Sequence, residues 1–397
     1  MKNANGLYRM KVFDVIICGG GPAGSTCALA LASSGLKIAV IEKESFPRGK
    51  VCGDAVAAYV PKVLSTIHPK YGEAVKAFTE KTPVNTCRII APNQQYIDVV
   101  SGETGFISTR MQWDDFLYRL TADEPNISWF LSHEITDASI DTQLKEVTVL
   151  AGGHTFKSKM VVGCDGAHSI INKKIAANKT DLAHYMGGVR GYYKNVTGMT
   201  DKTYELHFMK GILPGYFWIF PLPDNMANVG LCIPSSTVSK KKINLRHTIE
   251  DIIKDNPSIK SRFTKATLTG KLQGYGLPLG SRKVVVSGDH FMLCGDAASL
   301  IDPATGEGIG QSMISGRYAG WQIIKCFKEN NFSADFMKQY DRQLYKKLWW
   351  NARKSYLTQH IVFNRHWLFN GCFNLLSKSS FMKRLILKEI VKVANNK

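Results

Sequence analysis

The glycines near the N-terminus are the residues whose spacing most clearly indicates a chemistry. Gly19, Gly21 and Gly24 follow a short apolar run, and Pro22 and Ala23 stand among them. In a unit of strand, glycine turn and helix, the first glycine makes the tight turn. The second lets the backbone approach a diphosphate, and the third lets helix and strand pack closely. The unpaired N–H groups at the helix N-terminus favour the negative charge of the phosphates, so these residues predict a dinucleotide-binding turn.

An acidic residue follows where such a turn needs one. The apolar residues 37–41 predict a second strand, which ends at Glu42. A carboxylate there accepts hydrogen bonds from ribose hydroxyls and disfavours a ribose 2′-phosphate. Lys43, the next residue, joins the candidate cofactor-binding residues. The motif alone leaves FAD and NAD open, because both contain adenosine diphosphate.

Two distant stretches repeat the pattern of an apolar strand that ends beside an acid. One run leads into Asp165 and Gly166, and the other leads into Gly295 and Asp296. A long helix is predicted soon after the second pair. Its expected start contains Pro303, Gly306, Glu307, Gly308 and Ile309.

In this order the stretches resemble the FAD-dependent oxidoreductases of the p-hydroxybenzoate hydroxylase-like fold. The resemblance implies that Asp296 contacts a ribityl hydroxyl of FAD. It implies that the helix near Gly306 directs its positive end at the pyrimidine edge of the flavin, where negative charge develops on reduction. It also implies that Asp165 and Gly166 brace the first turn near the diphosphate, and that Arg110 starts a helix near the cofactor.

Three local features narrow the resemblance to the geranylgeranyl reductase family, flavoenzymes that saturate isoprenoid double bonds. They are Phe-Pro-Arg-Gly-Lys-Val-Cys-Gly-Asp at 46–54, Pro-Gly-Tyr-Phe-Trp-Ile-Phe-Pro at 214–221 with Asn-Val-Gly at 228–230, and Gly-Glu-Gly at 306–308. The family places its Cys-Gly loop beside the flavin ring. That placement adds Arg48, Cys52 and Gly53 to the expected cofactor-binding residues.

Four residues are candidates for the catalytic chemistry: Cys52, Asp54, Tyr216 and Trp218. Saturating an alkene needs a hydride from reduced flavin and a proton from an acid. Cys52, Asp54 or water could supply the proton, and a buried, inert cysteine is the alternative for Cys52. Tyr216 and Trp218 have the same parity, so they point to one face of a strand. There they either wall a lipid cavity beside the flavin or pack in the core, and the strand is expected to turn back at residues 222–225.

The predicted reaction is the reduction of carbon–carbon double bonds of a prenyl lipid by reduced FAD. The alternative is an FAD-dependent monooxygenase, a hydroxylase or a halogenase-like enzyme, acting on an apolar or aromatic substrate. Against the halogenase, the Trp-x-Trp-x-Ile-Pro signature is absent, because the chain has only Trp218-Ile-Phe-Pro. The sequence contains no second glycine-rich dinucleotide motif. NAD(P)H that binds transiently, or a ferredoxin, is therefore expected as the electron donor.

The chain, at 397 residues, exceeds the size at which one hydrophobic core stops growing, so two associated domains are expected. We predict an α/β fold with a discontinuous, Rossmann-like FAD-binding domain over 1–75, 105–180 and 280–330. A mixed β-sheet substrate domain is predicted over 76–104 and 181–279, and a basic, aromatic, helical C-terminal segment over 331–397. The nine cysteines form no CxxC pair, so neither a disulfide framework nor a metal site is expected.

The net charge of +19 is concentrated near the C-terminus, where residues 346–397 contain eleven Lys and Arg residues and one acid, Glu389. Residues 381–393 have apolar and basic positions at helical spacing. Such a helix could lie in an anionic lipid interface, and it could equally pack on the protein with its basic face in solvent. The candidate interfacial anchors are Trp349, Trp350 and Trp367. No recognised module accompanies the charge that would indicate nucleic-acid binding.

No charged and apolar leader appears at the N-terminus, where residues 1–9 read as a dispensable extension. No apolar run reaches the length of a membrane-spanning helix. We therefore expect a cytoplasmic protein, with peripheral attachment to the inner face of the membrane as the further hypothesis.

Overall fold

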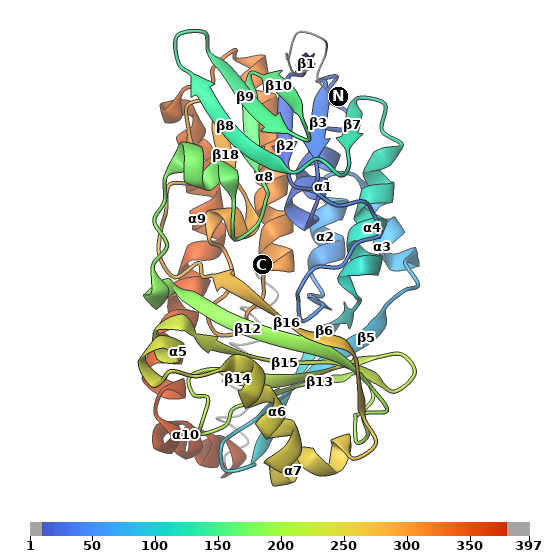
Figure 1. Cartoon of the computed structure of the whole chain (residues 1–397), viewed down its shortest axis with the longest axis vertical. Helices are drawn as coiled ribbons and strands as arrows, with labels where there is room; N and C mark the ends of the chain where they lie inside the picture. Colours follow the sequence, from blue (N-terminus) through green and yellow to red (C-terminus); the bar gives the residue numbers. More distant parts are fainter. Residues whose placement is uncertain (1–9, 379–397) are drawn as a thin grey trace.

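The computed structural model describes residues 10–378, and a six-stranded sheet holds the glycine turn at its centre (Figure 1). The strand order is β17-β18-β11-β2-β3-β7, and all neighbours pair in parallel except β17 and β18. The strand bounds are β2 Val15–Cys18, β3 Ile38–Ile41, β7 Ile127–Phe130, β11 Met160–Gly163, β17 Ser287–Gly288 and β18 Phe291–Leu293. The strands β2, β3 and β11 are buried along their whole length, as expected of a parallel sheet that is covered on both faces.

Helices α1 and α8 pack together against this sheet. Two glycines of α8 permit the close approach, because a Cβ at Gly316 would lie 2.2 Å from the Ala23 carbonyl oxygen and one at Gly320 would lie 2.5 Å from the Ala30 Cβ. The helices in this half of the molecule are α1 Pro22–Leu31, α2 Val60–Ser65, α3 Pro69–Ala77, α4 Arg110–Ala122, α8 Ile309–Lys328 and α9 Ala334–Thr358.

A separate four-stranded sheet was not predicted from the sequence. Its order is β1-β10-β9-β8, and it lies beside the end of the parallel sheet at the top of Figure 1. Its strands are β1 Met10–Val12, β8 Ile135–Asp141, β9 Glu146–Ala151 and β10 His154–Ser158. Strands β8, β9 and β10 form an antiparallel meander, and β1 adds to its edge in parallel.

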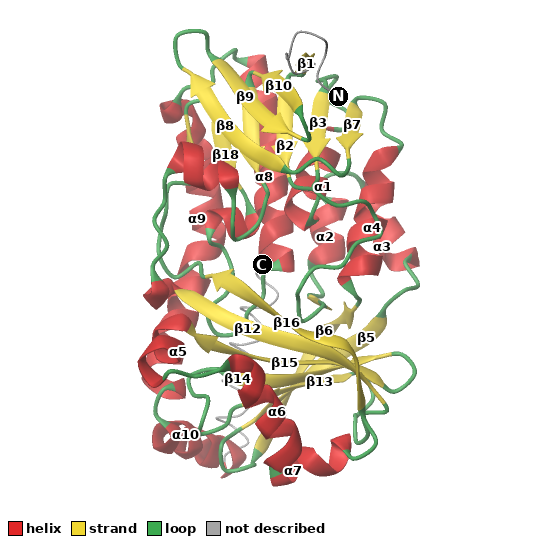
Figure 2. Cartoon of the chain, in the orientation of Figure 1, coloured by secondary structure: helices red, strands yellow, loops and turns green. Residues whose placement is uncertain are grey.

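A mixed eight-stranded sheet forms the other half of the molecule, below the first in Figure 2. The order is β16-β12-β15-β14-β13-β5-β6-β4, with β13 and β5 parallel and the other neighbours antiparallel. The bounds are β4 Ala55–Val56, β5 Thr82–Ile90, β6 Tyr96–Ile107, β12 Tyr185–Lys194, β13 Thr203–His207, β14 Tyr216–Leu222, β15 Met226–Pro234 and β16 Thr267–Pro278. The predicted α/β class with a mixed second sheet is confirmed.

The central strand β14 supplies side chains to two different hydrophobic clusters. Tyr216, Trp218 and Phe220 belong to one cluster, whereas Phe217 and Ile219 belong to the cluster that packs under α6 and α7. These are the two faces of the sheet, as alternation along a strand requires. The helices attached to this half are α5 Ser235–Lys241, α6 Leu245–Asp255 and α7 Pro257–Lys260.

The predicted turn between the two aromatic-rich strands is present. Leu222 pairs with Met226, and the connection passes through Asp224 and Asn225, which both have positive φ values, 59° and 55°. Aspartate and asparagine tolerate this left-handed conformation better than other side chains. The turn therefore forms where the sequence predicted it.

The C-terminal part is helical as far as it is described. After α9 come a π-helical turn, Gln359–Phe363, and α10, His366–Lys378. Phe369 and Phe373 of α10 belong to the same cluster as Tyr216 and Trp218. Within residues 10–378 no helix is both long enough and apolar enough to cross a bilayer. The extension at 1–9 and the amphipathic pattern at 381–393 lie outside the described residues.

The division into domains stays a prediction. Two strand segments do not follow it: β4, at residues 55–56, and the end of β6, at residues 105–107, were assigned to the FAD-binding domain and pair with each other in the eight-stranded sheet. Strand β4 carries the chain from the loop at 46–54 onto that sheet. As a result, this loop contacts both halves of the molecule.

Candidate active site

The glycine turn has a geometry that only glycine permits. Gly19 has φ +100°, and a Cβ there would lie 2.4 Å from the Cys164 carbonyl oxygen. A Cβ at Gly24 would lie 1.9 Å from the Gly19 carbonyl oxygen. Helix α1 begins with Pro22, and it has neither a side-chain cap nor an acidic residue in its first turn. Its positive end is thus left for an external anion.

Two arginines lie beside this turn. The atoms nearest to a Cβ at Gly21 are the Nη2 atoms of Arg48 and Arg110, at 3.7 and 3.8 Å. Both arginines donate to Asp114: Arg48 Nη1 to Oδ2 and Arg110 Nε to Oδ1, each at 2.6 Å. Burial raises the pKa of Asp114, but the two guanidinium groups outweigh it and hold the pKa below its usual value. Asp114, on α4, was missed because an i, i+4 pair with Arg110 reads as an ordinary surface ion pair.

Glu42 lies at the end of β3, next to the turn. Its Oε2 atom accepts a hydrogen bond of 2.8 Å from the Gly20 N–H and one of 3.3 Å from Arg48. The carboxylate is nearly buried, at 6% exposure. Lys43, the following residue, is exposed. The structure thus brings Glu42, but not the Lys43 ammonium group, into the ion-pair network beside the turn.

The ends of β11 and β18 reach the same region. Asp165 accepts hydrogen bonds from the Ser169 hydroxyl at 2.5 Å and from the Ile170 N–H at 2.7 Å, so it caps the turn that follows β11. A Cβ at Gly19 would also lie 2.9 Å from the Asp165 Cα atom, so the end of β11 packs against the first turn. The bracing role of Asp165 and Gly166 stays a prediction. Gly166 has φ +81°, and a Cβ there would lie 3.1 Å from the Tyr275 hydroxyl.

Asp296, after β18, forms an ion pair with Lys50. Lys50 Nζ lies 3.2 Å from Asp296 Oδ2, and the carboxylate side chain is 11% exposed. Gly295 before it has φ +58°, and a Cβ there would lie 2.6 Å from the Ser312 hydroxyl of α8. Lys50 belongs to the loop at 46–54 but was not among the predicted site residues. Nothing in the spacing between Lys50 and the glycine turn indicated a role for this residue.

The start of α8 meets the aromatic strand. Gly308 is the N-cap of α8, which has no side-chain cap and no acid in its first turn. The Tyr216 hydroxyl donates to the Thr305 carbonyl oxygen at 2.5 Å, and it would lie 2.6 Å from a Cβ at Gly306. Glu307 accepts a hydrogen bond from Tyr59. Pro303 and Ile309, at the two ends of this loop, are buried.

The loop at 52–54 packs against the aromatic face of β14. A Cβ at Gly53 would lie 3.1 Å from the Phe220 ring and 3.8 Å from the Trp218 ring. The rings of Tyr216, Trp218 and Phe220 follow one another at centroid distances of 6.1 and 5.9 Å. The four predicted catalytic residues are therefore brought onto one face of the sheet, beside the start of α8.

Asp54 is held in an unusual conformation. It is 0% exposed, and its φ of 68° is one that non-glycine residues rarely adopt. Its Oδ2 atom accepts hydrogen bonds from the Tyr192 hydroxyl at 2.6 Å and from Asn228 Nδ2 at 2.8 Å. Burial raises the pKa of Asp54 to about 6, although both hydrogen bonds oppose the shift. The sequence indicated Asn228 through its Asn-Val-Gly motif, but nothing marked Tyr192.

The Cys52 thiol lies close to Arg110. Burial raises the pKa of this thiol above its usual value, and the nearby Arg110 opposes the shift. The thiol is therefore protonated at neutral pH. The backbone carbonyl oxygen of Cys52 accepts a hydrogen bond of 2.8 Å from Asn228 Nδ2, which connects the loop to β15.

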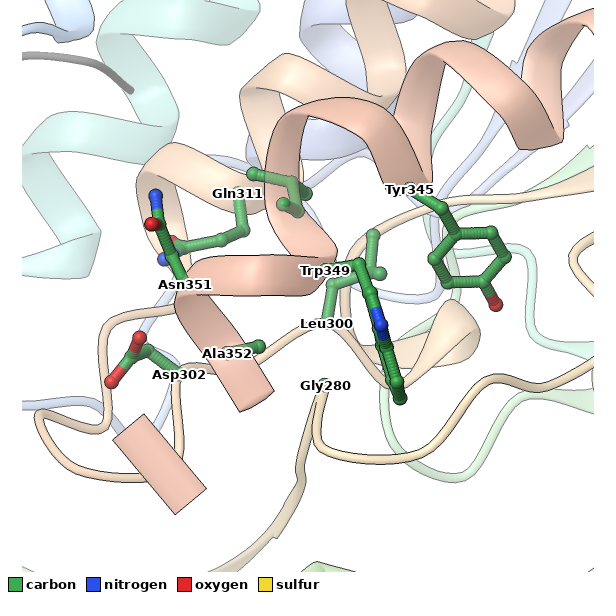
Figure 3. A pocket seen from close by; sticks show the side chains of 9 residues that line it. Gly280, Leu300, Asp302, Gln311, Tyr345, Trp349, Asn351 and Ala352 are labelled. Atoms are coloured by element: carbon green, nitrogen blue, oxygen red, sulfur yellow. The ribbon is translucent and has the colours of Figure 1, made fainter. Parts of the chain in front are cut away.

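A small pocket lies behind the loop that precedes α8 (Figure 3). It is bounded by Gly280, Leu300, Asp302, Gln311, Tyr345, Leu348, Trp349, Asn351 and Ala352. In Figure 3 the Trp349 ring and Leu300 form one side, with Gln311 and Asn351 on the other. None of the four predicted catalytic residues lines this pocket. We therefore do not place the substrate there.

The donors beside the turn fit FAD. The uncapped N-terminus of α1 and the guanidinium groups of Arg48 and Arg110 together match a diphosphate, and Glu42 lies where a ribose would follow. The uncapped N-terminus of α8 lies beside Asp296, whose side chain is 3.7 Å from a Cβ at Gly308. That end of a helix suits the part of a flavin that gains negative charge on reduction.

Fold and site together define an FAD-dependent oxidoreductase, and the comparisons with known families agree. Residues 14–171 match the family described as FAD dependent oxidoreductase, and residues 188–269 match the geranylgeranyl reductase catalytic domain. These two matches support the geranylgeranyl reductase family of FAD-dependent oxidoreductases that the sequence indicated.

Curated relatives cover most of the chain. The digeranylgeranylglycerophospholipid reductase of Thermoplasma volcanium is 27% identical over 84% of this chain and 83% of its own length. The menaquinone reductase of Mycobacterium tuberculosis is 28% identical over 77% of this chain and 75% of its own. The prediction of the family is thus confirmed.

Solved structures share the fold. A geranylgeranyl bacteriochlorophyll reductase-like protein from Thermoplasma acidophilum has a TM-score of 0.76 at 22% identity, covering 88% of this chain and 87% of its own. A flavin-dependent brominase has a TM-score of 0.80 at 20% identity, covering 97% and 94%. At these identities the similarity establishes the fold alone.

Proposed function

We propose that the protein reduces carbon–carbon double bonds of a prenyl lipid at the expense of reduced FAD. The observation that carries the proposal is the position of the aromatic face of β14, between the loop at 52–54 and the start of α8. Such a face offers an apolar wall to a long hydrocarbon chain next to the groups that would hold a flavin. Relatives named as reductases of a digeranylgeranyl phospholipid support this substrate class.

The residues of the chain have separable roles in this proposal. Bound FAD would supply the hydride. Arg48, Arg110 and Glu42 hold and orient the nucleotide end, and Tyr216 fixes the loop before α8 through its bond to Thr305. Trp218 and Phe220 exclude water and contact the lipid. Cys52 and Asp54 are the two residues that the sequence indicated as sources of the proton.

An external electron donor completes the cycle. We propose that NAD(P)H, binding transiently, or a reduced ferredoxin fills this role. Reduction of the purified flavoprotein by each donor under anaerobic conditions, followed in the visible flavin spectrum, distinguishes the two.

Anaerobic turnover tests the proposed function. The reduced protein is mixed with a detergent-dispersed, unsaturated prenyl phospholipid in the absence of oxygen. We expect the flavin to reoxidise and mass spectrometry to show one saturated double bond per flavin. A product that forms only with oxygen and contains an added oxygen atom would instead establish a monooxygenase, the alternative that the shared fold leaves open.

A further inference from the structure

The buried hydrogen-bond network around Asp54 fixes which of its two carboxyl oxygens can carry a proton. The indole Nε1 of Trp218 can only donate, and it lies 3.0 Å from Asn228 Oδ1. The amide of Asn228 is therefore oriented with its NH2 group toward the loop. That group donates to the Cys52 carbonyl oxygen and to Asp54 Oδ2, both at 2.8 Å.

The second oxygen of Asp54 is different. Oδ2 accepts from both Asn228 and Tyr192, whereas Oδ1 is buried and has no hydrogen-bond partner within the part of the chain that the structure describes. An oxygen that accepts two hydrogen bonds suits the carbonyl of a neutral carboxyl group. The proton then belongs on Oδ1, where it has no protein acceptor.

The backbone conformation of Asp54 also indicates that its surroundings hold this residue in place. Asp54 has a positive φ and lies beside Gly53, which packs on the Trp218 and Phe220 rings. A left-handed conformation is strained for most non-glycine residues and persists where the surroundings impose it. Here the Ser108 N–H, at 3.0 Å from the Asp54 carbonyl oxygen, and the two side-chain donors impose it.

We propose that Asp54 is the catalytic acid, which gives the Oδ1 proton to one carbon of the lipid double bond. This inference rests on the proposed function. The other carbon receives a hydride, with its two electrons, from the reduced flavin. The carbon–carbon π bond is consumed, two C–H bonds form, and the flavin becomes oxidised. The Asp54 carboxylate that remains takes up a proton from solvent before the next turnover.

Acid strength favours Asp54 over Cys52. An isolated alkene is a weak base, so the stronger of two available acids protonates it faster. Burial raises the pKa of Asp54 to about 6, which leaves a carboxyl group that is still a much stronger acid than the Cys52 thiol. The charged and titratable groups that face Asp54 are Cys52 from its own loop, Arg110 from α4, and Arg190 and Tyr192 from β12.

The test measures the rate constant of flavin reoxidation by prenyl phospholipid in a single anaerobic turnover as a function of pH. Asp54 gives its proton only when neutral, so the wild-type rate should fall roughly tenfold per pH unit above about pH 6. Asp54→Asn keeps the shape of the side chain and should lower the rate by roughly 10²- to 10⁴-fold. Tyr192→Phe removes a hydrogen bond that lowers the Asp54 pKa, so the falling limb should move to higher pH.

Two controls and one direct readout accompany these variants. Asp341→Asn removes a part-buried carboxyl group on α9, which accepts a hydrogen bond from Ser287 of β17 at 2.6 Å, and should leave the pH profile unchanged. Cys52→Ala should keep the limb near pH 6 whatever its effect on the rate. Infrared difference spectra should show a carboxyl C=O band that titrates near pH 6 in the wild type and is missing from Asp54→Asn, at equal flavin content.

The outcomes separate the two proposals. A wild-type protein that prenyl lipid never reoxidises overturns the proposed function and this assignment with it. A wild-type protein that turns over, while Asp54→Asn has the same rate and pH profile, overturns the assignment of Asp54 alone. If the fall of the rate above pH 6 disappears in Cys52→Ala but persists in Asp54→Asn, the catalytic acid is the Cys52 thiol.

Discussion

At the scale of single residues, the site combines glycines that have a local steric requirement with a hydrogen-bond network that joins distant parts of the chain. Gly19 and Gly24 leave a local signature in the sequence, because the φ of +100° at Gly19 and the 1.9 Å between a Gly24 Cβ and the Gly19 carbonyl oxygen both require glycine in one short turn. The partners of Asp54 leave none. Tyr192 and Asn228 lie 138 and 174 residues away along the chain, and only the folded sheet brings them to its carboxylate. A hydrogen-bond network between distant elements has no characteristic spacing in the sequence, so its members cannot be predicted from sequence motifs.

Gly24 provides a residue-scale test of the cofactor site. A methyl group at this position would meet the Gly19 carbonyl oxygen at 1.9 Å, so Gly24→Ala must displace the turn from α1. Overpacking of this kind costs about 1–3 kcal/mol. If the strain falls on the bound geometry, FAD should bind roughly 5- to 150-fold more weakly. The measurement is a fluorescence titration of apoprotein with FAD.

A matched control for Gly24 lies in β6, outside the loops assigned to FAD. A Cβ at the exposed Gly102 would have no atom within 4 Å, so Gly102→Ala should bind FAD with unchanged affinity. Equal affinities for both variants and the wild type would contradict the assignment of the turn to the dinucleotide.

At the scale of elements, the strand–turn–helix units were predictable and the pairing of strands was not. The first βαβ unit, the two later strands with their acids and the hairpin at 222–225 each lie within a short window of sequence. The meander was missed because β8 and β10 contain few apolar residues, although β9 between them alternates regularly. The order of the eight-stranded sheet, with β13 paired to β5 in parallel, depends on contacts between distant segments.

The packing of α10 on the aromatic face makes an element-scale prediction. Phe369 is 3% exposed, and its ring lies 4.9 Å from the rings of Phe208 and Phe363 and 5.0 Å from Phe373. Phe369→Ala removes these contacts and leaves a cavity, which should lower the free energy of unfolding by about 3–5 kcal/mol. Urea denaturation followed by circular dichroism measures the change.

Leu375, on the same helix, is the control for Phe369. It is 53% exposed, so Leu375→Ala should change the stability by no more than about 0.5 kcal/mol. A Phe369→Ala protein as stable as the control would show that α10 is not part of the core in solution.

At the scale of the whole molecule, the excess positive charge still needs a partner. Part of the aromatic content of the C-terminal segment is now accounted for, because Phe369 and Phe373 are buried against the sheet. Trp350 and Trp367 are not: they are 67% and 65% exposed, on α9 and α10. Truncation after residue 345 would also remove the buried Leu348, so it cannot test the surface without disturbing the core.

Surface variants test membrane attachment without that defect. If the exposed tryptophans enter a lipid interface and the basic groups meet anionic headgroups, the protein should sediment with anionic vesicles at low salt. It should be released as salt screens the charges, and it should not bind neutral vesicles. The double variant Trp350→Ala, Trp367→Ala should bind several-fold more weakly while its unfolding curve stays unchanged, because neither side chain is buried.

The control for this last prediction lies at the other end of the molecule. Leu144 is 71% exposed in the turn between β8 and β9, at the opposite end of the view from α10 (Figure 1). Leu144→Ala should bind vesicles as the wild type does, because a protein that docks through its C-terminal helices holds that turn away from the lipid. Equal loss of binding in both variants would indicate nonspecific adhesion of exposed apolar side chains. Binding unaffected by salt and by the tryptophans would assign the positive charge to a soluble partner, for which an acidic electron-donor protein has the complementary charge.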